Sequence, residues 1–118
     1  MMLSRTPSTA DVTLFAPFEI WEVPFGNATI KFHKPLVLTP ALMPDDPEEP
    51  DDHEYLQIIC HELNIDVWAE DRDDLLEMIF SEIRFVWNHI VLKNDDDLDF
   101  ESKMIKRNHL ALAEVVDE

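Results

Sequence analysis

The most regular pattern of apolar and polar positions lies between residues 71 and 91. Apolar side chains recur there every three or four positions, a spacing that places them on one face of an α-helix. The stripe consists of Leu75, Leu76, Ile79, Phe80, Ile83, Val86, Trp87, Ile90 and Val91. Asp71 can accept hydrogen bonds from the amides that follow it and cap this helix. A stripe this wide predicts cover on two sides, by a sheet and by another element or a second subunit.

Two β-rich segments, 17–25 and 28–33, precede this helix and flank the pair Gly26-Asn27. Glycine reaches positive φ without steric cost, so the pair favours a two-residue hairpin loop. In the second segment Ile30 and Phe32 alternate with polar residues, which predicts that both point inward.

A second pair of strands is predicted directly before the helix. Segment 55–60 is apolar on both faces apart from Gln57, which suits a central strand. Residues 61–64 form the turn, and the alternation in 65–69 is typical of a half-buried strand.

The last element predicted is a shorter helix from Phe100 to about Val115, with Met104, Ala111 and Leu112 facing inward. The order of elements predicts an α+β fold, a small antiparallel sheet of three to four strands with one long and one short helix packed on one face. We expect one domain over 17–118, with a disordered leader at 1–16. Segment 43–54 holds three prolines and seven acids and is expected to be an extended loop.

The net charge is −17, from 26 acidic against 9 basic residues. Such a field repels nucleic acid and attracts a basic protein, so no direct nucleic-acid binding is expected. No apolar run approaches the ~18 residues of a membrane span. The single cysteine, Cys60, excludes an intramolecular disulfide and favours a reducing cytoplasm.

Catalysis and metal binding find little support in the sequence. His53 and His61 stand at opposite ends of a predicted strand, about 25 Å apart by strand rise, so they do not share an ion. Burial in an apolar strand raises the pKa of Cys60 and leaves it inert. With one glycine in the chain no glycine-rich phosphate loop is present. We therefore expect no enzyme, metal or cofactor.

The candidate binding residues surround a tryptophan. The alternation in 65–69 turns Trp68 away from the buried face, beside Asp66 and Glu70. An exposed aromatic flanked by acids is typical of an anchor for a basic partner. The alternative is that the N-terminal segment or the acidic loop covers Trp68. Three further candidates are Asp95, Asp96 and Asp97.

The run from Glu54 to Leu76 resembles the core of HicB-like antitoxins. In that family a strand, a short turn and a second strand lead into an acidic-capped helix; here 62–64 match the turn, 65–69 the second strand and Asp73-Asp74-Leu75 the helix start. Asn64 stands where the family has its turn glycine and tolerates the same left-handed conformation, but the usual Thr and Gly of the second strand are absent. The resemblance implies a small, basic, RNA-cleaving toxin of the HicA type as partner.

The sequence thus favours an acidic protein-binding module, antitoxin-like and at least dimeric. The alternative is a nucleic-acid mimic, whose spaced carboxylates imitate phosphates and block a DNA- or RNA-binding enzyme.

Overall fold

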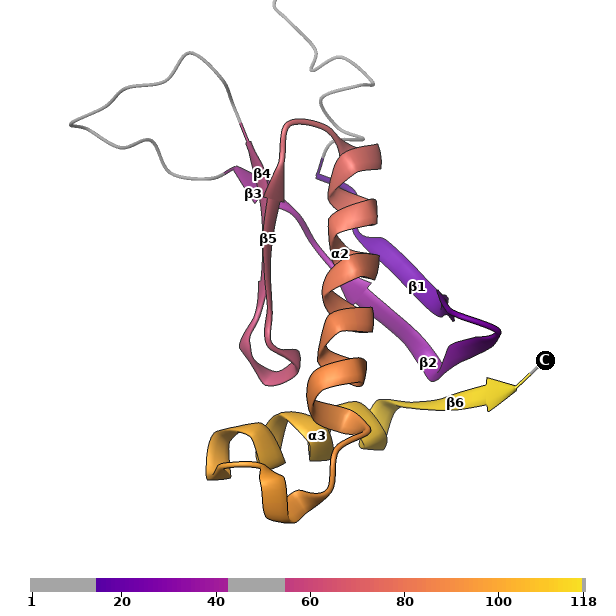
Figure 1. Ribbon diagram of the computed structural model, residues 1–118. Helices are drawn as coiled ribbons and strands as arrows, with labels where there is room; N and C mark the ends of the chain where they lie inside the picture. The colour runs from indigo at the N-terminus through magenta and orange to yellow at the C-terminus, as the bar shows by residue number, and fades with distance from the viewer. Residues whose placement is uncertain (1–14, 43–54, 118) are drawn as a thin grey trace, which may run out of the picture.

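The computed structural model describes residues 15–42 and 55–117, which form an α+β fold (Figure 1). The predicted fold class is confirmed, but the strands form two three-stranded antiparallel sheets rather than one sheet of three to four strands. Two short strands that the sequence did not predict, β3 (Ala41–Leu42) and β6 (Ala113–Asp117), complete them. Residues 1–14 of the predicted leader (1–16) and the acidic loop at 43–54 lie outside the described residues.

The first sheet has the order β1-β2-β6 and is built on the predicted hairpin. Strands β1 (Phe18–Phe25) and β2 (Ala28–Leu38) are joined by Gly26-Asn27, and Gly26 has φ +63°, the region that glycine enters without strain. The pairing shifts register between Ile20 and Glu22. Such a bulge bends a strand and redirects the side chain within it.

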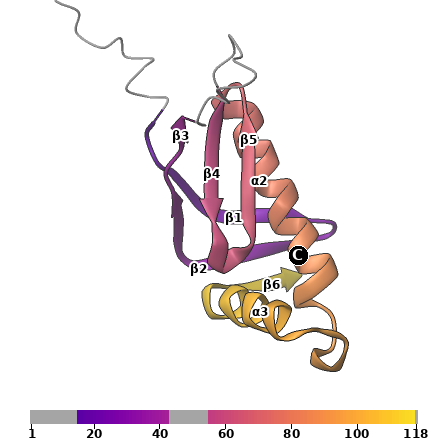
Figure 2. The same cartoon turned by 90° about the vertical axis from the view of Figure 1, so that its left-hand side faces the viewer.

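The second sheet has the order β3-β4-β5 and runs across the first (Figure 2). Strands β4 (Leu56–Cys60) and β5 (Ile65–Ala69) are joined by the 3₁₀ turn η1 (His61–Leu63). The predicted central place of β4 is confirmed. Its two faces differ, however, because Ile58 is buried and Ile59 is 49% exposed. The apolar character that the sequence showed on both faces of this strand therefore does not mean that both faces are buried.

The long helix α2 (Arg72–Val86) begins where the sequence predicted and continues as a π-helical turn, η2 (Trp87–Val91). Asp71 accepts a hydrogen bond of 2.8 Å from the amide of Asp74, which confirms the predicted cap. The helix contacts both β5 and β1, so it covers parts of both sheets. Its buried side chains are Leu75, Ile79, Ile83 and Val86.

The width of the apolar stripe is therefore explained within one chain. The two sides of the stripe meet the two sheets, and the stripe no longer argues for a second subunit. The homodimer stays a prediction.

After the 3₁₀ turn η3 (Asp95–Asp97), the helix α3 (Phe100–Leu112) crosses the end of α2 (Figure 1). This helix ends earlier than predicted, because the last residues pair with β2 as β6. Its predicted inner face is also wrong. The buried residues of α3 are Ile105 and His109, whereas Ala111 and Leu112 are exposed.

Candidate functional site

The hairpin β4–η1–β5 positions the candidate site. Asn64 adopts the left-handed conformation with φ 60°, and its amide donates a hydrogen bond of 3.1 Å to the carbonyl of His61. Asparagine tolerates this region better than most residues, as the sequence predicted. Leu63, buried at the turn, fixes the hairpin against the core.

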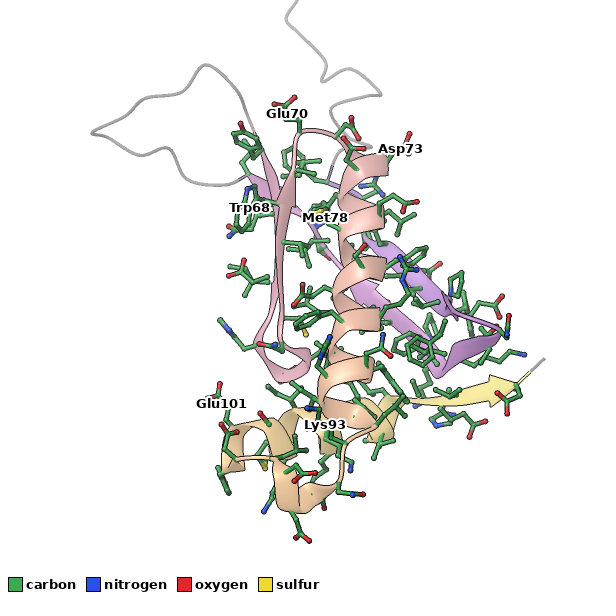
Figure 3. The ribbon with its side chains drawn as sticks, in the orientation of Figure 1. Trp68, Glu70, Asp73, Met78, Lys93 and Glu101 are labelled. Carbon is green, nitrogen blue, oxygen red and sulfur yellow. The ribbon has the colours of Figure 1, made fainter. Side chains whose placement is uncertain are left out.

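The face of β4 and β5 that points away from the core carries two large apolar side chains and two polar ones. Gln57 lies opposite Trp68 and Ile59 lies opposite Asp66, and all four side chains share this face because residues alternate along each strand. Trp68 is 48% exposed. Figure 3 places Trp68 on the side of β5 away from α2. The four residues Gln57, Ile59, Asp66 and Trp68 are called the Trp68 face below.

The predicted orientation of Trp68 is thus confirmed, and among the described residues half of this indole stays open to solvent. The Nε2 amide of Gln57 donates to Oδ1 of Asp66 over 3.5 Å, which holds the two polar side chains together across the strands. Polar pairs across neighbouring strands contribute modestly to the stability of a sheet.

Negative charge collects beside this face. Glu70 follows β5 at the start of the turn into α2 (Figure 3). Glu82 on α2 is half-buried, and burial together with the nearby Asp66 carboxylate raises its pKa. Burial is the larger cause of this shift, and charge repulsion from Asp66 adds to it.

The three aspartates of η3 do not join the Trp68 face. The twenty residues from Arg72 to Val91 separate Glu70 from η3 by about 30 Å of helix. Asp95 instead forms a salt bridge of 2.8 Å with Lys106, and this hydrogen bond lowers the pKa of Asp95. The six predicted binding residues therefore fall into two separate places.

Residues suited to metal binding or nucleophilic chemistry are dispersed. Within 15–42 and 55–117 no group of three His, Cys, Asp or Glu side chains could hold a metal ion. His53 lies outside the described residues. Cys60 is half-buried, and burial raises the pKa of its thiol, as expected from its strand. No helix in the described part of the chain is long and apolar enough to cross a membrane.

Sequence reasoning missed a buried polar pair at the turn between β4 and β5. The indole Nε1 of Trp87 donates to Nδ1 of His109 over 3.1 Å, and Nε2 of His109 lies 2.9 Å from the carbonyl of Leu63. Since Nδ1 accepts, the ring is the neutral Nε2–H tautomer and donates to Leu63. The bonds join α3, η2 and the hairpin turn. No local pattern signals this pair, because its two side chains lie 22 residues apart in the chain.

Comparisons with known proteins identify no family. No protein-family model matches the chain, and neither the curated proteins nor the solved structures contain a match.

Proposed function

We propose that this protein is a binding module that holds a basic protein partner on the Trp68 face. The observation that supports it is the half-exposed Trp68 on the outer face of β4 and β5, with Ile59 and the acids Asp66 and Glu70 around it. Aromatic anchors of this kind supply most of the energy of many interfaces, and acids around them select a basic partner.

In its specific form, the proposal is an antitoxin-like protein that neutralises a small basic RNA-cleaving toxin of the HicA type in the cytoplasm. The resemblance of 54–76 to HicB-like antitoxins and the net charge of −17 support this form. The charge would speed encounter with a basic partner, while the buried area around Trp68 would set how long the complex lasts.

The test is co-expression with the product of the neighbouring gene, followed by co-purification and growth measurement. The wild type should co-purify with that product and relieve the growth arrest it causes when expressed alone. Trp68→Ala should weaken binding by about thirtyfold, the effect of a loss of about 2 kcal/mol at an interface anchor.

Trp21→Ala is the matched control, because Trp21 is 57% exposed on β1 in the other sheet. This variant should bind like the wild type. Equal losses for the two variants, or a neighbouring product that neither binds nor arrests growth, would contradict the proposal. If Trp68→Ala were harmless and neutralising several acids abolished binding, the nucleic-acid mimic would be favoured instead.

A further inference from the structure

A groove along α3 has the opposite charge to the rest of the molecule. Its volume is about 450 Å³, within the size range of small-molecule sites. The lining residues are Asp95, Lys103, Lys106, Arg107, Leu110 and Ala111. Lysine and arginine number nine in the whole chain, and three of them meet here. Three cations against one carboxylate leave the groove with two positive charges.

One of these cations is fixed in place before any ligand arrives. The Nζ of Lys106 donates to the carbonyl of Lys93 over 2.6 Å and to Asp95 over 2.8 Å. An ammonium group has three donors, so one remains for a ligand. Arg107 follows directly, and Lys103 stands one turn earlier on the same side of α3. Together the three cations line one groove, and the charge of Lys106 within it is held in place.

The apolar part of the groove shows what else a ligand needs. Leu110 is 49% exposed, and Ala111 beside it is also exposed. A purely anionic ligand would bind the cations but leave Leu110 and Ala111 exposed to solvent. A ligand with a small apolar or aromatic group next to its anionic group would cover both.

Two larger occupants fit less well. If α3 of a second copy paired antiparallel with this helix so that Phe100 met Leu110, then Lys103 would face Arg107, and like charges would repel. A nucleic acid brings many charges into the field of a chain with net charge −17, and that repulsion grows with each phosphate. A small ligand with two negative charges avoids both costs.

We propose that this groove binds a small phosphate monoester, whose phosphate lies among Lys103, Lys106 and Arg107 and whose organic group lies on Leu110 and Ala111. The guanidinium of Arg107 can donate two parallel hydrogen bonds to phosphate oxygens, a geometry that favours phosphate over a point-like anion. The site is separate from the Trp68 face and does not depend on the function proposed for it.

The experiment is an NMR titration of the ¹⁵N-labelled full chain with phenyl phosphate. Amide shifts should concentrate at 93–95 and 103–111, with a dissociation constant of about 1 mM. Benzenesulfonate, which has the same ring and one charge, should bind at least about tenfold more weakly. Inorganic phosphate, which lacks the ring, should also bind more weakly.

The variant Lys103→Gln/Arg107→Gln should weaken phenyl phosphate binding by tenfold or more. Lys31→Gln/Lys34→Gln is its control, because it removes the same charge from β2 and should bind within twofold of the wild type. The proposal is overturned if phenyl phosphate shifts no amide of α3, if both double variants lose the same affinity, or if benzenesulfonate binds equally well.

Discussion

The buried contact between Trp87 and His109 leads to a quantitative prediction about stability. His109 is fully buried, and its ring bridges the indole Nε1–H of Trp87 and the carbonyl of Leu63. Replacing it by leucine keeps an apolar side chain of similar size but leaves both partners without a hydrogen bond. A buried donor or acceptor left unsatisfied costs about 1–3 kcal/mol, so His109→Leu should lower the free energy of unfolding by about 2–6 kcal/mol.

The same histidine gives stability a defined pH dependence. Burial lowers the pKa of His109 from its ordinary value of 6.5. The unfolded chain therefore binds a proton near pH 6.5 that the folded chain does not bind. The stability contributed by neutral His109 is complete above this pH and is lost as the pH falls below it. The slope is at most about 1.4 kcal/mol per pH unit, the value for one proton.

Urea unfolding followed by far-UV circular dichroism from pH 5 to pH 7.5 measures both effects. Subtracting the curve of a variant from that of the wild type removes the contribution of carboxyl groups common to both, including Glu82. Because His109→Leu alone could unfold a marginal domain, His109→Gln is the second variant. Its side-chain amide can still donate to Leu63, so it should cost less than leucine while losing the same pH slope.

His33→Gln is the control, since His33 is exposed on β2. It should keep the wild-type slope. The reasoning is refuted if the stability of His109→Gln falls between pH 7 and pH 5 as steeply as that of the wild type. It is also refuted if His109→Leu costs less than about 1 kcal/mol, since two buried groups would then be satisfied in some other way.

Three further predictions concern single positions near the site. Asn64→Gly should leave the urea midpoint unchanged or raise it, whereas Asn64→Val should lower stability by about 1–2 kcal/mol, because φ is 60° there. Asp71→Ala should lower the free energy of unfolding by about 1 kcal/mol, because the amide of Asp74 loses its cap. Urea unfolding that gives the same free energy as for the wild type would contradict that role. Glu82→Gln should raise the urea midpoint at pH 7 and have little effect at pH 4, because burial and Asp66 raise the pKa of Glu82 and disfavour its charged form.

Local rules were sufficient for much of this fold. The cap at Asp71, the turn at Gly26 and the left-handed Asn64 each depend on the backbone preferences of one or two residues. The outward orientation of Trp68 follows from strand alternation alone. These are the features that the sequence predicted correctly, and the Trp68 face is built from them.

The short elements at the C-terminal end could not be read in the same way. Apolar residues lie on nearly every side of α3, so periodicity did not select its inner face. His109 is buried because Trp87, 22 residues earlier, provides a hydrogen-bond partner, and no local pattern contains that information. Strand β6 likewise pairs with Ala28–Phe32, more than eighty residues earlier, so its pairing depends on the tertiary fold.

Charged residues also divide into those that local structure explains and those that it does not. Acids at the start of α2, such as Asp73 and Asp74, and Lys93 after its end complement the helix dipole, so stability alone accounts for them. Dipole effects fall off within one turn, and they explain neither Asp66 on β5 nor Lys103 in the first turn of α3, where a cation opposes the dipole. The charges that helix stability does not account for are therefore few. They stand beside exposed apolar side chains, where displaced water would strengthen each contact.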